Sequence, residues 1–198
     1  MPIIHQEQEN AFRIMSESCM EKYAPEFVDH HQSSAALALD VRIVQNDGEL
    51  YRRTCIGYED GHISLFHVKI DSETGQAKVL SKFEQNYSST ISSLLFLDNN
   101  ELLVGAMWEG IVYYSNVENG LEGGVFVEDS NKYDAVTSLC KLRRLDGQGF
   151  CCGTFGKRLL VYSVKDNECK RVWTREFRNP ILQIRSFDIV GNFIISNV

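Results

Sequence analysis

This 198-residue sequence lacks the features of a membrane-spanning, secreted or nucleic-acid-binding protein. No stretch approaches the ~20 apolar residues that a membrane-spanning helix requires. The first residues, MPIIHQEQENAF, contain neither the basic nor the apolar region of a signal peptide. The net charge of −7 argues against a phosphate-rich partner, which needs a basic face. We therefore expect a cytoplasmic chain with no direct membrane insertion and no nucleic-acid partner.

Motifs that carry catalysis or bind cofactors are also missing. The sequence contains no nucleophile elbow, P-loop, dinucleotide fingerprint or HExxH motif. It has six cysteines but no CxxC pair, and without a secretion signal we expect reduced thiols. The sequence therefore predicts no enzyme, no catalytic residue and no cofactor.

Two short stretches are candidate metal sites. Asp29, His30 and His31 form one, but this site would need further ligands from elsewhere in the chain. Asp146-Gly147 looks like the end of a calcium loop. However, Leu142 and Arg144 occupy the positions where oxygen ligands are required. We predict that the chain holds no metal.

A repeat of 48 residues organises the chain. Three segments, 53–68, 101–116 and 149–164, each consist of a short apolar strand, a turn and a second apolar strand. The interval of 48 recurs twice at a glycine, at an aliphatic residue and at an aromatic residue: Gly57, Gly105 and Gly153; Ile63, Ile111 and Leu159; Phe66, Tyr114 and Tyr162.

Two further strands complete each unit. An apolar run precedes each hairpin and another follows it: 33–41, 90–100 and 135–147 before, and 77–85, 123–130 and 170–177 after. A fourth, shorter copy begins at 180–192. Four strands in about 48 residues are typical of a β-propeller blade. We predict an all-β partial β-propeller with WD40-like or FG-GAP-like blades, about three of them complete and four-stranded and one truncated.

This pattern divides the chain into two parts. Residues 33–198 form the partial propeller, which is cut inside its last blade. Residues 1–32 are interpreted as the end of a preceding blade and a linker, with a candidate short helix at Glu17–Phe27 that Pro25 would end. Because a closed propeller needs about four to eight blades, we expect a fragment or incomplete gene product of a longer protein. Closure of the ring by oligomerisation is the alternative.

The adjacent cysteines Cys151 and Cys152 invite a catalytic, redox or metal-binding interpretation. Shifts of 48 residues place this pair on Leu103–Val104 and on Cys55–Ile56. Neighbouring side chains of a strand point to opposite faces, and a free cysteine packs like a small apolar residue. We therefore predict that both thiols are buried and unbridged, each facing a neighbouring blade. Cys140 is predicted to be isolated.

Tyr58, Trp108 and Phe155 are the candidate interface residues. They lie in or beside three corresponding hairpin turns on one rim, where exposed aromatic side chains make good anchors. The alternative is that each ring covers only its own turn and the neighbouring blade. A site in a central channel would instead need acidic or histidine residues where the first strands begin. Those positions hold hydroxyl or amide side chains that we expect to cap strand ends: Ser34, Ser92, Thr137 and Gln183.

The segment 110–164 resembles the C-terminal half of the kaptin family. The similarity is carried by Gly120-Leu121-Glu122, by the run 134–140 and by the Leu145-Asp146-Gly147 turn. Weaker identities in the same order extend it to approximately 20–190. The family tends to keep acidic residues before the Asp-Gly turn, and Leu142 and Arg144 depart from that pattern.

The resemblance implies a scaffold. Kaptin-like proteins are propeller-like subunits of the KICSTOR complex, which holds the GATOR complex at the lysosomal surface and restrains TOR kinase signalling when amino acids are scarce. The implied partners are the other KICSTOR subunits and, through them, GATOR. The family is also associated with actin filaments in actin-rich cell projections, which gives one alternative. A propeller subunit of a coat or ciliary complex is another.

Overall fold

The described part of the chain is entirely β-structure and turns. The computed structural model describes residues 34–46, 49–71, 73–97, 100–128, 130, 134–144, 147–186 and 193–196. None of these residues is helical, so no helix there could cross a membrane. The segment predicted at 1–32, its candidate helix at Glu17–Phe27 and the final residues 197–198 lie outside the described residues.

Three four-stranded antiparallel sheets, here called blades 1 to 3, have their strands in chain order. A two-stranded sheet follows and is called blade 4. Blade 1 contains β1 (Ala36–Asn46), β2 (Glu49–Tyr58), β3 (His62–Ile70) and β4 (Ala77–Asn86). Blade 2 contains β5 (Ile91–Phe96), β6 (Leu102–Ala106), β7 (Gly110–Tyr114) and β8 (Val125–Phe126). Blade 3 contains β9 (Val136–Arg144), β10 (Gly147–Thr154), β11 (Arg158–Lys165) and β12 (Glu168–Glu176), and blade 4 contains β13 (Gln183–Ser186) and β14 (Phe193–Ser196). The prediction of a propeller-like repeat of four strands is confirmed.

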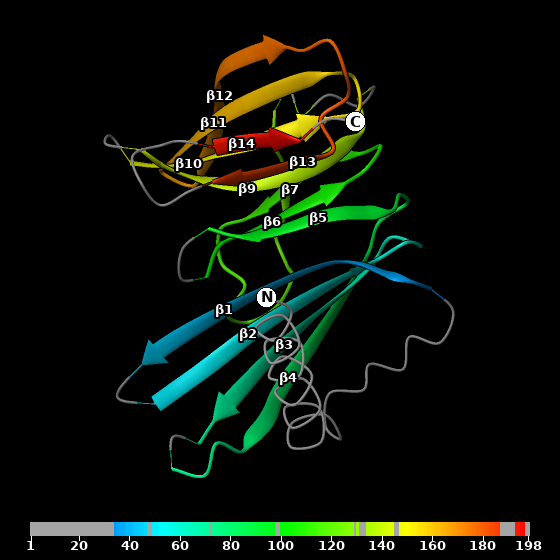
Figure 1. The fold of residues 1–198 in the computed structure, drawn as a ribbon. Coiled ribbons are helices and arrows are strands. Elements are labelled where there is room, and N and C mark those ends of the chain that lie inside the picture. Colours follow the sequence, from blue (N-terminus) through cyan, green and yellow to red (C-terminus); the bar gives the residue numbers. More distant parts are fainter. Residues whose placement is uncertain are drawn as a thin grey trace, which may run out of the picture.

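The blades stack face to face in chain order, with β1–β4 at one end and β9–β14 at the other (Figure 1). Their first strands lie side by side, since β1 contacts β5, β5 contacts β9, and β9 contacts β13. The apolar core therefore lies between successive blades. Cys55 and Leu65 of blade 1 pack with Leu94 of blade 2, and Leu103 of blade 2 packs with Leu139 of blade 3.

The repeated glycines allow this close stacking. A β-carbon at Gly57 would meet Ile91 at 2.3 Å, and one at Gly105 would meet Val136 at 2.8 Å. At Gly153 the obstacle would be Ile181 at 2.6 Å. In each case the obstructing atom belongs to a β-branched residue at the start of the next blade. The 48-residue interval of glycine thus marks where one blade presses on the next.

A β-bulge recurs at the start of each first strand. The pairing register shifts at Leu37, Ser92 and Thr137, so these three residues are structurally equivalent. Ser34 is not their equivalent, which corrects the sequence alignment of Ser34 with Ser92 and Thr137. The prediction that these hydroxyls only cap strand ends locally is also wrong for Ser92 and Thr137. Each hydroxyl lies within hydrogen-bonding distance of a carbonyl of its own blade. Each also reaches a carbonyl in the next stretch of chain, that of Val136 for Ser92 and that of Ile181 for Thr137.

Blade 2 has the shortest outer strand. The sequence predicted a strand over 123–130, whereas β8 spans only Val125–Phe126. Gly123 has a positive φ of 71°, which breaks the extended conformation. A β-carbon at Gly124 would meet the ring of Tyr114 at 2.7 Å. Both strand residues are exposed, so the outer edge of blade 2 carries two uncovered apolar side chains.

Candidate interface on the turn rim

In each complete blade, one turn joins the second strand to the third, and these three turns lie on the same rim. The turns span 58–62, 106–110 and 154–158. A backbone hydrogen bond ties each turn to the residues before the blade's first strand. The amides of Glu59, Met107 and Phe155 donate to the carbonyls of Ala35, Thr90 and Ala135 at 2.9, 2.8 and 2.8 Å. Each turn is therefore fixed to the residue that precedes the first strand of its blade.

A side-chain acceptor reinforces every turn. Ser34 Oγ accepts the amide of Asp60 at 3.0 Å, and Ser89 Oγ accepts the amide of Trp108 at 2.8 Å. In blade 3, Asp134 Oδ1 accepts the amide of Gly156 at 2.5 Å. The three acceptors occupy the same place in their blades, although the sequence analysis did not connect them. Their separations from the donor are 26, 19 and 22 residues, so no fixed interval marks them in the sequence.

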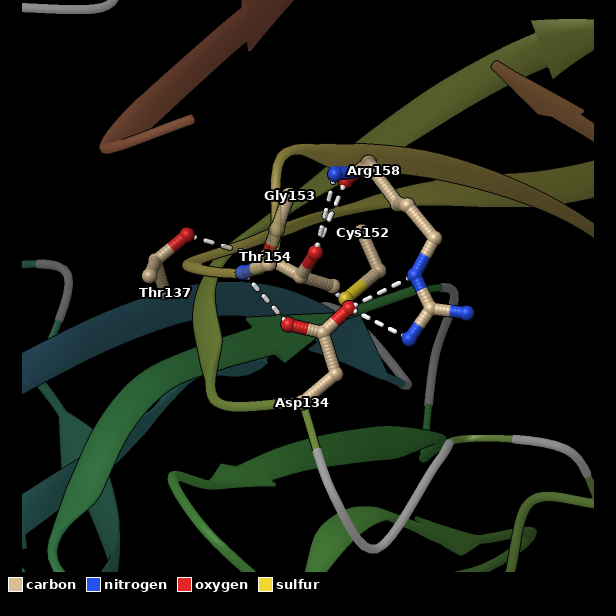
Figure 2. Close-up of polar contacts among 7 residues, drawn as sticks. Asp134, Thr137, Cys152, Gly153, Thr154 and Arg158 are labelled. Atoms are coloured by element: carbon tan, nitrogen blue, oxygen red, sulfur yellow. Dashed lines mark hydrogen bonds and ion pairs between the residues drawn. The ribbon is translucent and has the colours of Figure 1, made fainter. Parts of the chain in front are cut away.

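The turn of blade 3 contains a buried ion pair (Figure 2). The Asp134 side chain is only 3% exposed, and its Oδ2 accepts Arg158 Nε at 2.8 Å and Nη2 at 2.7 Å. Thr154 Oγ1, in the same turn, accepts the Arg158 amide at 3.1 Å. The carboxylate therefore joins the turn amide to the guanidinium, and both of its oxygens are satisfied. These contacts account for the burial of the charged group, since both carboxylate oxygens have hydrogen-bond donors.

The three predicted interface residues do not share one environment. Trp108 and Phe155 are 58% and 57% exposed, in the turns of adjacent blades. Tyr58 is only 4% exposed, because it is the last residue of β2 and lies beneath its turn. Its ring centroid lies 5.6 Å from that of His62. The rim therefore offers Trp108 and Phe155 to a partner, and an interface function for all three residues stays a prediction.

The charge of this rim changes along the blades. The turn of blade 1 carries the exposed acids Glu59 and Asp60, whereas the turn of blade 3 carries the exposed Lys157 and the partly exposed Arg158. The turn of blade 2, which carries Trp108, comes between these two turns. An exposed indole on a fixed backbone, with acidic and basic neighbours, can anchor a protein partner without large loss of conformational freedom.

The two adjacent cysteines point to opposite faces of blade 3, as predicted. Cys151 packs with Ile181 and Ile184, toward blade 4, and Cys152 packs with Leu103 and Ile111 of blade 2. Both are fully buried and unbridged. Burial raises the pKa of the Cys152 thiol, and a hydrogen bond with Cys140 together with burial raises that of Cys151.

Cys140 is not isolated, which corrects the sequence analysis. It lies directly opposite Cys151 in the pairing of β9 with β10. The Cys151 thiol lies 3.6 Å from the Cys140 carbonyl oxygen, within range of a weak hydrogen bond. Cys169 is half-buried near Glu101, and burial raises its pKa to about 12. The raised pKa values of the Cys151, Cys152 and Cys169 thiols keep them predominantly protonated at neutral pH, which does not favour nucleophilic chemistry.

A groove runs along the first strands, where a central-channel site would lie. Its volume is about 410 Å³, and Ser92, Ser93, Thr137 and Ser138 line it together with residues of β1 and β13. Arg185 is the single ionisable side chain among the lining residues. No group of three or more His, Cys, Asp or Glu residues that could hold a metal occurs in the described ranges. Asp29, His30, His31 and Asp146, considered as ligands above, lie outside those ranges.

Comparison with known proteins places the chain in a family. A family model described as KICSTOR complex protein kaptin matches residues 3–104 and 97–195. The chain belongs to this family. The kaptin resemblance seen in the sequence is therefore confirmed and covers nearly the whole chain. No match to a curated protein reaches significance.

The fold has a counterpart among solved structures. The chain is similar to one chain in a crystal structure of BBS1N in complex with ARL6DN, soaked with mercury, with a TM-score of 0.53 and 14% sequence identity. The match covers 80% of this chain and 47% of that chain. At this identity the likeness concerns the fold alone, and it supports the propeller-like architecture of this kaptin-family chain.

Proposed function

We propose that this kaptin-family chain acts as a non-enzymatic scaffold, as a KICSTOR subunit that helps to restrain TOR kinase signalling when amino acids are scarce. The family match over residues 3–195 carries this proposal. The partners would be other KICSTOR subunits and, through them, the GATOR complex at the lysosomal surface. The proposal is consistent with the thiols and the buried carboxylate described above, which are all engaged in packing or structural hydrogen bonds.

The rim around Trp108 and Phe155 is the proposed contact surface. These two large rings are more than half exposed, and hydrogen bonds anchor their turns to the residues that precede the first strands. Most of the binding energy at protein interfaces comes from a few residues, with Trp, Tyr and Arg enriched among them. We therefore assign Trp108 the larger share of the contact and Phe155 a smaller one.

The test is co-purification from cells with the known KICSTOR subunits. We expect the tagged chain to retain those subunits and its depletion to leave TOR signalling partly active during amino-acid starvation. Trp108→Ala should weaken the interaction by about thirtyfold, equivalent to about 2 kcal/mol, with little change in melting temperature. The matched control is Val125→Ala, which truncates another exposed apolar residue, on β8.

Three results would count against the proposal. Absence of KICSTOR subunits under mild lysis, with normal signalling after depletion, would contradict the scaffold function. Retention on actin filaments instead would favour the actin-associated alternative. If Trp108→Ala lowers melting temperature and binding together, the ring covers its own turn and is no anchor.

A further inference from the structure

The outer edge of blade 2 differs from the outer edges of the two neighbouring complete blades. β4 and β12 are 10 and 9 residues long, whereas β8 has 2 residues. These two, Val125 and Phe126, are 65% and 54% exposed. Among the described strands only β7 pairs with β8, so the other side of β8 is open. An open strand edge of this kind can accept a further strand.

The backbone of Phe126 faces this open side. Val127 donates its amide to the Ile111 carbonyl at 2.8 Å, so the Val127 amide faces β7. In an antiparallel pair the residues whose backbone groups face the partner alternate, so the amide and carbonyl of Phe126 point away from β7. An added strand can therefore form backbone hydrogen bonds with Phe126.

The two exposed side chains lie on opposite faces of the blade. Val125 pairs with Tyr113, which packs with residues of blade 3. Phe126 pairs with Val112, which packs with residues of blade 1. On the blade 3 side, Val125 lines a groove of about 220 Å³ that Cys169 also lines. Because neighbouring residues of a strand point to opposite faces, two adjacent apolar residues of an added strand would contact Val125 and Phe126 in turn.

The surroundings of this edge are acidic. Residues 83–131, which include the whole of blade 2, contain eight Asp or Glu and no Lys, Arg, His or Pro. Glu122 and Glu128 are exposed on either side of the apolar pair. Glu168 adds a carboxylate at the groove, where Lys170 lies 3.4 Å from it. Lysine and proline, which commonly protect a strand edge, are thus absent from blade 2.

We propose that the outer edge of blade 2 binds an extended segment of a partner protein, in which two adjacent apolar residues are flanked by lysine or arginine. The segment adds to β8 as a further strand, a common mode of peptide recognition. Its apolar residues pack on Val125 and Phe126, and its basic residues lie near Glu122 and Glu128. Opposite charges steer the encounter and fix the register of the added strand.

Other segments of this chain fit the edge less well. Residues 1–33 contain six Asp or Glu against two Lys or Arg, so they would bring like charge to it. β12 of a second copy has three basic and two acidic residues, and it carries a bulge at Val172. A bulge bends a strand and disrupts its hydrogen-bond ladder. A basic partner segment in extended conformation matches both the charge and the backbone of this edge. The inference does not rest on the proposed scaffold function.

Fluorescence anisotropy with a synthetic peptide tests the proposal on the purified chain. The labelled probe has a central valine–leucine pair with two lysines on each side, and its matched control has glutamates in place of the lysines. We expect a dissociation constant on the order of 100 µM for the lysine probe, because the contact is small. The glutamate control should bind at least about tenfold more weakly. Glu122→Lys combined with Glu128→Lys should reverse this preference.

A backbone-methylated probe distinguishes strand addition from charge attraction alone. Methyl groups on the valine and leucine amides remove their donors, which should weaken binding of the lysine probe by about tenfold. Hydrogen exchange at the Phe126 amide should also slow when the unmethylated probe is bound.

Two further variants separate this edge from the rim around Trp108. Val125→Ala combined with Phe126→Ala should weaken binding of the lysine probe by about tenfold, whereas Trp108→Ala should leave it unchanged. Co-purification of KICSTOR subunits should show the reverse, so failure of one proposal is distinguishable from failure of the other. Unchanged melting temperatures will show that each variant is native.

Four results would overturn the proposal. The first is no binding of the lysine probe at about 1 mM. The second and third are equal binding of the glutamate control and equal binding of the methylated probe. The fourth is self-association of the chain that the double alanine substitution abolishes, because this would assign the edge to a second copy.

Discussion

The turns of blade 2 and blade 3 perform the same structural task with different chemistry. Both hold a backbone amide of the turn against a side-chain oxygen that lies before the first strand. In blade 2 the acceptor is the neutral hydroxyl of Ser89, and the turn residue is the exposed Trp108. In blade 3 the acceptor is the carboxylate of Asp134, which also binds Arg158. The side chain that accepts the turn amide is therefore neutral in blade 2 and charged in blade 3.

This difference shows that a repeat can keep its backbone geometry while the side chains at equivalent positions have different roles. The Asp134 carboxylate fills the space beside the turn, so residue 156 must be glycine. The shorter Ser89 leaves room for a side chain at the equivalent position, and that side chain is the indole proposed as an anchor. We therefore expect the side-chain acceptor to contribute more to stability in the turn of blade 3 than in the turn of blade 2. The following substitutions test this contrast.

Removing the carboxylate should have the largest effect. Asp134→Ala leaves the Gly156 amide without its side-chain acceptor and the Arg158 guanidinium without its ion-pair partner. We expect a loss of about 3 kcal/mol in the free energy of unfolding, the lower end for a buried pair because Arg158 is 27% exposed. Urea denaturation measures it. Asp134→Asn, which retains an acceptor for the turn amide, should lose less, and an equal loss in both variants would show that the turn bond contributes nothing.

Adding one methyl group to the turn of blade 3 should have the next largest effect. A β-carbon at Gly156 would lie 2.2 Å from Asp134 Oδ1, so Gly156→Ala must displace the carboxylate. We expect a loss of about 2 kcal/mol, typical of overpacking at a tight contact. The cost should nearly vanish in an Asp134→Ser background, which reproduces the chemistry of blade 2. Persistence of the full cost there would place the strain in the backbone instead.

Removing the hydroxyl of blade 2 should have the smallest effect. Ser89→Ala deletes one neutral hydrogen bond to the Trp108 amide, which is worth about 1 kcal/mol. Thermal unfolding should show a fall of about 2–4 °C for a chain of this size. Ser88→Ala removes only a solvent-exposed hydrogen bond, from Ser88 Oγ to the Glu109 carboxylate, so it is the control and should change little. A loss as large as that of Asp134→Ala would remove the distinction between the two turns.

The repeat and the strand order could be predicted because close packing restricts residue types locally. Only glycine fits where Gly57, Gly105 and Gly153 meet the next blade, so these residues recur at the strand spacing itself. The packing of Cys151 and Cys152 followed from the same interval. Both inferences concern the second strands of the blades, which keep the interval of 48 residues.

The polar contacts of the rim could not be predicted in the same way. The first strands do not keep that interval, since Leu37, Ser92 and Thr137 are 55 and 45 residues apart. Ser34, Ser89 and Asp134 therefore fall out of register in the sequence, and they differ in chemistry as well. The partnership of Cys140 with Cys151 depends on the length of the β9–β10 connection, which hydrophobic patterning does not specify. The burial of Tyr58 could not be predicted either, because a shift of one or two residues along a hairpin decides whether an aromatic ring is buried or exposed.

The hydroxyl groups of Ser92 and Thr137 reach from one blade to the chain that begins the next, and this has a consequence for the way the molecule opens. A blade that detaches leaves its neighbour with an unsatisfied carbonyl and an uncovered apolar face, so detachment at an end is easier than rupture in the middle. Native-state hydrogen exchange should therefore be slowest in β6 and β7, which have a complete blade on both sides. It should be faster in the outer strand β12, and the molecule should come apart inward from its ends.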